Sequence, residues 1–433
     1  MKTQFLQKFY QKTRLDRIDA LRLAEAISDE DANLLKEGLT IPNDIANNMI
    51  ENQIAKYELP LGAAMNFLID GKEYVVPMAI EEPSVLAAAS SAAKLIKQAG
   101  GFTTRVTERT MIGQVALIDV PNLELAEKTL LEHKDEILQK ANDSKPSIVK
   151  RGGGAKDVVV RILPADEALE TPAFLVVHLH IHTLEAMGAN IIDTMVEAIK
   201  PYVEELTGGK SLMGILSNYN TECLATAECR IPVELLAKGE FSGEEVRDRI
   251  IAANQLALVD PYRAATHNKG IMNGIDAVVI ATGNDWRAIE AGCHAYAARS
   301  GQYRSLTSWT KGENGELVGR LTVPLAIGTV GGQISIHPGA QFNKRLLGNI
   351  PAKELESVIV SVGLGQNFSA IKALVTEGIQ KGHMALHARS LAISVGAVGS
   401  EIHEVSERLR QHQHMDLKTA EQILLELRKQ NEM

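Results

Sequence analysis

Four side chains along the chain carry the chemistry that an active site needs, namely a carboxylic acid, an amine, a second carboxylate and an imidazole. They are Glu82, Lys269, Asp285 and His383. A protonated carboxyl and an imidazolium can donate protons, and an ammonium stabilises negative charge that develops on an oxygen. The four residues lie far apart in sequence, so only folding could bring them together.

Three of these residues also have a purely structural interpretation. Glu82 precedes an Ala-rich helical segment, so it is either an acid in an apolar setting or a charge that favours a helix N-terminus. Lys269 lies in a polar, glycine-containing segment, residues 260–276, which we expect to be a loop; an exposed loop lysine is the alternative. Asp285 precedes a predicted helix and has the side chain of an N-cap.

His383 raises the question of a metal. His383 and His387 are four residues apart and would share one face of a helix. A zinc protease motif needs glutamate directly after the first histidine, and Met384 stands there instead. We therefore expect no metal site. The structural alternative to a functional His383 is a histidine that simply lies at the surface. Gly382 predicts that one helix ends and another begins just before His383.

The glycine-rich segments do not predict a nucleotide fold. Gly363 and Gly365 begin a GxGxx pattern, but Phe368 stands where the dinucleotide fingerprint needs a third small residue. The glycines at 328–332 lack the lysine and hydroxyl residue of a P-loop. A Rossmann domain is therefore not expected.

Composition excludes several classes of protein. The 433 residues are enough for about three domains. The net charge of −9 argues against general binding of nucleic acid or of a membrane surface, and no apolar run reaches the length of about 18 residues that a membrane span needs. Three cysteines without CxxC spacing favour neither a disulfide framework nor a zinc site, and they suggest a cytoplasmic protein.

The pattern of strands and helices predicts an α+β fold. Ser28 and Ser242 have the spacing of helix N-caps, and Asp70-Gly71 predicts a hairpin turn. Residues 110–219 show the order strand, helix, strand, strand, helix, strand, which is typical of a small ferredoxin-like domain inserted into a larger one. Its first helix is expected over 123–141. The last part of the chain is predicted to be helical, with separate helices over 351–362 and 369–381.

Five blocks of the sequence together resemble a class II 3-hydroxy-3-methylglutaryl-coenzyme A (HMG-CoA) reductase, and the resemblance covers nearly the whole chain. The blocks are EEPSV at 81–85, EAMGAN at 185–190, DPYRAATHNKGIMNGID at 260–276, ATGNDW at 281–286 and TEGIQKGHMALHAR at 376–389. They are long, ordered and specific.

The resemblance implies a role for each reactive residue. Glu82 would donate a proton, Lys269 would stabilise the oxyanion, Asp285 would orient the lysine, and His383 would protonate the thiolate of coenzyme A. The implied substrate-binding residues are Ser84, Asn218, Arg263 and Asn273. The implied cofactor-binding residues are Glu185, Met187, Gly188 and Asn190, with Lys145 added by our count along the chain.

The resemblance also implies the organisation of the protein. A large domain (1–109 and 220–376) would bind HMG-CoA and form the dimer. The inserted domain (110–219) would bind the dinucleotide without a Rossmann fold, and a helical flap (377–433) would close over the site. The implied reaction converts HMG-CoA to mevalonate and coenzyme A with two NAD(P)H, through a hemithioacetal and mevaldehyde. Active sites would lie at the interface of a homodimer, which could assemble further.

Four positions depart from the family pattern or distinguish its members. Gln53 and Ala55 replace residues of the family's ENVIG block, and Glu185 replaces an aspartate. Lys145 stands where NADH-preferring relatives carry aspartate, and a cation there would attract the 2′-phosphate of NADPH. We therefore predict that NADPH is preferred and that NADH is possible.

Three other functions remain open at this point. A metal-dependent hydrolase would use His383 and His387. A protein that only binds coenzyme A, or a scaffold, could keep the fold without turnover. A reductase of another acyl thioester would use the same mechanism.

Overall fold

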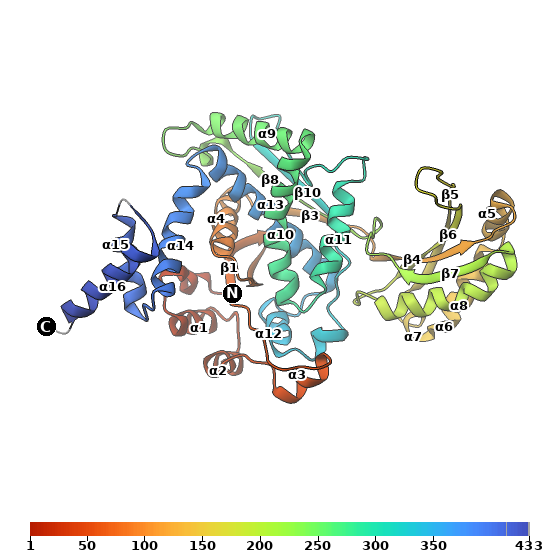
Figure 1. Cartoon of the computed structure of the whole chain (residues 1–433), viewed down its shortest axis with the longest axis horizontal. Helices are drawn as coiled ribbons and strands as arrows, with labels where there is room; N and C mark the ends of the chain where they lie inside the picture. Colours follow the sequence, from red (N-terminus) through yellow and green to blue (C-terminus); the bar gives the residue numbers. More distant parts are fainter. Residues whose placement is uncertain (413, 432–433) are drawn as a thin grey trace.

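The structure, a computed structural model, describes residues 1–412 and 414–431, and for 379–386 and 431 it describes the backbone alone. In this described part, helices surround three antiparallel sheets, so the predicted α+β class is confirmed. Figure 1 shows a central body with a smaller sheet-based unit at one end and a unit of α14, α15 and α16 at the other.

The central body contains a hairpin and a four-stranded sheet of order β3-β8-β10-β9. The hairpin turns at Asp70 and Gly71, which both have positive φ, as the predicted Asp-Gly turn requires. The strands of the body are β1 (Leu61–Ile69), β2 (Lys72–Ala79), β3 (Thr103–Val106), β8 (Leu224–Ile231), β9 (Thr307–Lys311) and β10 (Leu317–Pro324).

Nine α-helices of the described chain belong to the body and its N-terminal segment, and serine caps begin two of them as predicted. Ser28 accepts from the amide of Asp31 at 3.0 Å, and Ser242 accepts from that of Glu245 at 3.2 Å. The helices are α1 (Arg14–Leu23), α2 (Asp29–Glu37), α3 (Asn43–Met49), α4 (Val85–Gln98), α9 (Gly243–Val259), α10 (Pro261–Ala281), α11 (Trp286–Ala297), α12 (Pro338–Leu346) and α13 (Ala352–Val375). Short 3₁₀ helices cover Thr3–Leu6, Phe9–Gln11, Val233–Leu235 and Gly332–Ser335.

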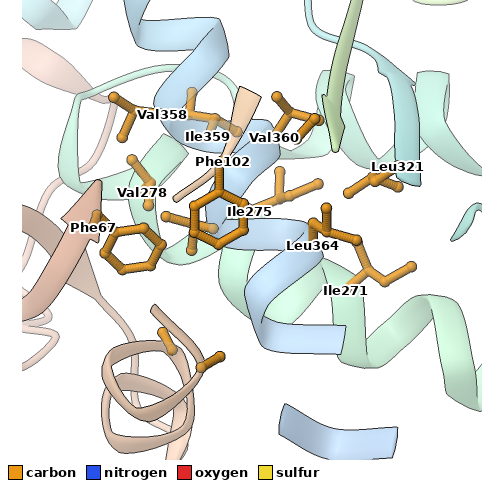
Figure 2. Close-up of a cluster of buried hydrophobic side chains, with 14 of the residues drawn as sticks. Phe67, Phe102, Ile271, Ile275, Val278, Leu321, Val358, Ile359, Val360 and Leu364 are labelled. Carbon is orange, nitrogen blue, oxygen red and sulfur yellow. The ribbon is translucent and has the colours of Figure 1, made fainter. Parts of the chain in front are cut away.

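The core of the body forms where α10 crosses α13. Figure 2 shows Ile271, Ile275 and Val278 of α10 facing the side chains of α13. Gly363 allows this approach, because a Cβ there would lie 2.9 Å from Ile275 Cγ1. The 363–368 glycine pattern is therefore a packing feature in the middle of a helix, which agrees with the rejection of a nucleotide loop.

Three sequence predictions for the helices were wrong. The expected loop over 260–276 is helix α10, and the two helices expected over 351–362 and 369–381 are largely the single helix α13. Among the described residues, α13 is the one helix long and apolar enough to cross a membrane, but most of it is buried in the core. The helix expected over 123–141 is divided at His133.

The smaller unit has the predicted order of strands and helices. Its sheet has the order β5-β6-β4-β7, with α5, α6 and α8 packed on one face. Its elements are β4 (Thr110–Ile118), α5 (Leu123–Glu132), α6 (Lys134–Ser144), α7 (Pro146–Val149), β5 (Gly154–Leu163), β6 (Phe174–His182), α8 (Ala189–Thr207) and β7 (Lys210–Leu216).

The C-terminal unit has an apolar core of its own, which includes Leu391, Val405, Leu409 and Leu424. Its helices are α14 (Ile379–Ser394), α15 (Ser400–Arg410) and α16 (Leu417–Asn431). The break between α13 and α14 lies at residues 376–378, where Gly378 has φ +77°. The predicted break at Gly382 is wrong, because that residue lies within α14.

Candidate active site

The acid and the amine singled out in the sequence are in direct contact. Lys269 Nζ lies 2.5 Å from Glu82 Oε2, and Asn273 Nδ2 donates to Glu82 Oε1 at 3.1 Å. The side chains of Lys269 and Glu82 are 59% and 35% exposed, so the pair faces solvent. The apolar setting considered for Glu82 is therefore wrong: its carboxylate accepts from an ammonium and an amide.

Helix α10 presents Lys269 by anchoring the two residues before it. Asn268 is buried, donates to the carbonyl of Arg304 at 2.9 Å and accepts from the amide of Leu306 at 3.0 Å. His267 is buried and contacts Thr307 Oγ1 at 2.6 Å. Since Asn273 follows Lys269 by one helical turn, both side chains reach Glu82 from one face of the helix.

Burial fixes the charge state of His267. Loss of hydration, with the charge of Arg263 as a smaller contribution, lowers the pKa of His267 to about 3. The imidazole is therefore neutral at physiological pH, and it acts as a hydrogen-bonding anchor between α10 and its neighbours.

Ser84 stands at the start of α4 in a strained conformation. Its φ is +76°, and its side chain makes no capping hydrogen bond to the helix. A non-glycine residue in this region costs free energy and is concentrated at functional sites. Ser84 therefore combines a strained backbone with a hydroxyl that does not cap the helix, two residues after Glu82.

A groove of about 1080 Å³ runs along α4. Leu86, Ser90 and Lys94 of that helix line it, opposite the N-terminal segment and α1. The complete lining holds four basic side chains, Lys8, Arg14, Arg17 and Lys94, and none that is acidic. In a chain of net charge −9, basic side chains without acidic neighbours in the lining favour an anionic ligand over a cationic one.

Asp285 is the N-cap of α11. Its carboxylate accepts from the amides of Arg287 and Ala288 at 3.1 Å, as the structural alternative predicts. Arg287 also lies 3.5 Å from it. Among the described side chains, Asp285 makes no hydrogen bond to Lys269.

Three of the predicted cofactor residues, Glu185, Met187 and Gly188, lie on the loop of residues 184–188, within the connection from β6 to α8. Gly188 has φ +99° and precedes α8 without a side-chain cap. Met187 and Asn218 line one small pocket together with Ala288 of α11. The Glu185 carboxylate turns toward the body, where it accepts from Thr329 Oγ1 at 2.8 Å and from the amide of Ala352 at 2.7 Å.

Lys145 lies between α6 and α7 and has no ion-pair partner among the described residues. The glycine turn that follows lies against the end of β6, because a Cβ on Gly153 would be 2.6 Å from the carbonyl oxygen of His182. Asn142, three residues before Lys145, bonds to Ala155, which pairs with Ile181 near the end of β6, so this turn lies on the side from which the 184–188 loop leaves. Asn190 lies in the first turn of α8, and Arg263 in the first turn of α10.

The side chain of His383 lies outside the described residues, and the backbone places the residue in the first turns of α14. Over the described part of the chain, no three His, Cys, Asp or Glu side chains are grouped so that they could hold a metal ion.

Sequence reasoning missed the basic lining of the groove. Lys8, Arg14 and Arg17 come from the N-terminal segment and Lys94 from α4, so no local motif connects them. It also missed Arg109, a buried arginine between β3 of the central body and β4 of the smaller unit.

Comparison with known proteins identifies the family. A family model described as hydroxymethylglutaryl-coenzyme A reductase matches residues 13–388. A 3-hydroxy-3-methylglutaryl-coenzyme A reductase from Archaeoglobus fulgidus is 45% identical over 97% of this chain and 94% of its own length. A probable reductase of the same name from Borreliella burgdorferi is 32% identical over 80% of this chain and 78% of its own.

Solved structures extend the comparison to the fold. The reductase from Streptococcus pneumoniae is 49% identical and superposes with a TM-score of 0.84, over 98% of this chain and 99% of that one. A second structure of that class II enzyme, described as bound to NADPH in open conformations, gives a TM-score of 0.82 over 96% and 100%. The chain therefore belongs to the hydroxymethylglutaryl-coenzyme A reductase family, in its class II form.

Proposed function

We propose that this protein reduces HMG-CoA to mevalonate and coenzyme A with two equivalents of NADPH. The observation that carries the proposal is the contact of Glu82 with Lys269 and Asn273, next to the start of the helix that lines the basic groove. We assign the groove to the phosphate-bearing coenzyme A portion of the substrate, since Lys94 and the N-terminal cations line it.

The residues around Glu82 suit the reduction of a thioester. Conversion of a thioester to a primary alcohol takes four electrons, which two hydrides from the reduced nicotinamide supply when it is bound. Each addition places negative charge on the carbonyl oxygen, where the ammonium of Lys269 stabilises it. Glu82 in its protonated form donates its proton to that oxygen, and Asn273 fixes the orientation of its carboxyl group. Ser84 and Arg263 hold the acyl portion.

Expulsion of coenzyme A needs an acid for the departing thiolate, and we assign this role to His383 on α14. The C-terminal unit, residues 377–433, would act as a flap that turns about residues 376–378. Its separate apolar core supports movement as a rigid body. In the described conformation Asp285 caps α11, so we propose that it approaches Lys269 only when substrate is bound.

The smaller unit, residues 110–219, suits the dinucleotide. The uncapped amides of α8 after Gly188 attract a diphosphate, and Met187 and Asn190 flank it. Lys145 has no ion-pair partner among the described residues, so its ammonium is available to the 2′-phosphate that distinguishes NADPH from NADH. These residues fit the cofactor that the pneumococcal relative binds.

Exposed apolar residues support the proposal of a homodimer. They lie next to Gln53 and Ala55, where the sequence departs from the family's ENVIG block. Ile54 is 98% exposed and Tyr57 is 95% exposed in the single chain. Large apolar side chains that are almost fully exposed in neighbouring positions indicate a protein interface. We expect Ile54→Asp to shift the protein toward monomers in sedimentation or light scattering, whereas a variant that keeps the native oligomer would contradict this use of the segment.

The activity is tested by mixing the purified protein with HMG-CoA and following nicotinamide absorbance, with NADPH and NADH in parallel. We expect two nicotinamides oxidised per mevalonate formed, and no loss of activity after chelation of metals. Thiol release without nicotinamide oxidation would support a hydrolase instead. Absence of both reactions, with HMG-CoA still bound, would support a binding protein, and oxidation only with another acyl thioester would change the substrate.

A further inference from the structure

The 184–188 loop is attached to the central body as well as to the smaller unit. Glu185 bonds to Thr329 and Ala352 through its carboxylate, and its carbonyl accepts from the amide of Thr329 at 2.8 Å. Ala186 forms an isolated parallel bridge with Val330. Gly328 lies so close that a Cβ there would be 2.6 Å from the amide nitrogen of Met187. A shift of residues 327–330 would therefore move the loop with them.

One buried side chain, that of Arg109, forms hydrogen bonds to both segments, the 184–188 loop and residues 327–330. Arg109 is 1% exposed, and its guanidinium donates to the carbonyls of Leu184 at 2.5 Å and of Ala186 at 3.0 Å. It also donates to the carbonyl of Ile327 and to the carboxylate of Glu356. A guanidinium presents several donors in a rigid plane, so one arginine can fix the positions of several carbonyl groups together.

Glu356 supplies the charge that makes this arrangement possible. It is 0% exposed at the start of α13, and one carboxylate oxygen, Oε2, has no hydrogen-bond partner among the described residues. Burial raises the pKa of Glu356 to about 7, while Arg109 acts in the opposite direction. Removing either partner would leave the other as an unpaired buried group, which is costly.

Residues 327–330 also contact the residue that precedes Asp285. The side chain of Asn284 accepts from the amide of Gly328 at 2.7 Å and donates to its carbonyl at 3.1 Å. Asn284 directly precedes Asp285. A displacement of residues 327–330 would therefore disturb both the cofactor loop and the start of α11.

We propose that Arg109, paired with Glu356, is a positioning residue that fixes the 184–188 loop on the central body and thereby sets the affinity for the reduced nicotinamide dinucleotide. The proposal rests on the assignment of that loop to the cofactor in the proposed function. Neither residue touches the reacting atoms, so the pair acts through the loop.

The test uses the conservative variants Glu356→Gln and Arg109→Lys in the full chain, because truncation to alanine could prevent folding. Lys353→Gln is the matched control. Lys353 pairs with Glu108 at 2.8 Å at the exposed surface, and this ion pair joins the same two parts of the chain as the Arg109–Glu356 pair. The readouts are direct NADPH binding by nicotinamide fluorescence and the KM values for NADPH and HMG-CoA.

We expect both variants to weaken NADPH binding and raise its KM by about tenfold or more, as misplacement of a positioning group does. The KM for HMG-CoA should stay within about twofold, and the control should resemble the wild type in both. Unchanged NADPH binding in both variants, or equal rises in the two KM values, would overturn the proposal while leaving the reductase function intact. Failure of the wild-type protein to bind NADPH would overturn the proposed function and this inference together.

Discussion

Replacing Lys269 with methionine should abolish most of the activity while leaving the fold almost unchanged. Methionine keeps the length of the side chain and removes the ammonium that contacts Glu82 at 2.5 Å. The backbone of α10 should not respond, because its anchors at this point are His267 and Asn268, which are buried and hydrogen-bonded independently of Lys269.

The exposure of the pair sets the magnitude of each effect. With side chains 59% and 35% exposed, the Lys269–Glu82 ion pair should contribute no more than about 1 kcal/mol to the free energy of unfolding. Loss of a group that stabilises an oxyanion typically costs about 2.7–4 kcal/mol in the transition state, or about 10²- to 10³-fold in kcat. The catalytic effect should therefore exceed the effect on stability.

Lys72→Met is a close control for this experiment. Lys72 pairs with Glu354, and the two side chains are 57% and 31% exposed, so the variant removes an ion pair of nearly the same exposure. Lys72 begins β2, whereas Glu82 follows the other end of that strand. Both variants should lose similar stability in urea, and Lys72→Met alone should keep wild-type kcat. The reasoning fails if Lys269→Met keeps more than about a tenth of kcat, or if it unfolds more than about 2 kcal/mol more easily than the control.

Three further predictions follow from the charges of the structure. Burial and the carboxylate of Glu290 raise the pKa of Asp276, so the wild type loses stability as the pH rises above the unfolded value of about 4. Asp276→Asn should therefore unfold at higher urea than the wild type at pH 8 and lose this advantage near pH 4, at a rate of at most about 1.4 kcal/mol per pH unit. Lys145→Asp should raise the KM for NADPH by about tenfold or more and change that for NADH much less, with Lys150→Asp as the control; equal changes for both cofactors would refute the assignment. Asp285→Asn should keep the melting temperature, because asparagine caps a helix as well as aspartate does. It should lower kcat, because the proposed charge that acts on Lys269 is lost. An unchanged kcat would show that Asp285 serves only as the helix cap.

Local signals in the sequence predicted the elements whose stability is local. The caps at Ser28 and Ser242, the Asp70–Gly71 turn and the Ala-rich helix α4 all formed as expected. Helix α10 was mistaken for a loop because Gly270, Gly274 and several polar residues lower its intrinsic propensity.

Tertiary packing explains why those residues nevertheless form a helix. A Cβ on Gly274 would lie 2.9 Å from Gln366 Cβ, so the glycine allows α10 to approach α13, and the polar residues before it are anchored in the core. The same reasoning applies to α13, where Gly363 resembled a loop signal. A preference of about 1 kcal/mol against a helical glycine is small compared with the burial of a central helix.

The candidate catalytic residues were assigned roles from the sequence largely through family resemblance, and the structure supplies a physical reason for the spacing of those on α10. In α10, His267 and Asn268 face the core while Lys269 and Asn273 face Glu82, because a helix turns by 100° per residue. An active-site amine must be held firmly and still meet its substrate in the presence of water. Burying the two preceding residues provides the rigidity, and leaving the ammonium exposed avoids the desolvation that a buried charge would incur. Within one turn of α10, His267 and Asn268 therefore hold the helix in place, and Lys269 presents its ammonium to the site.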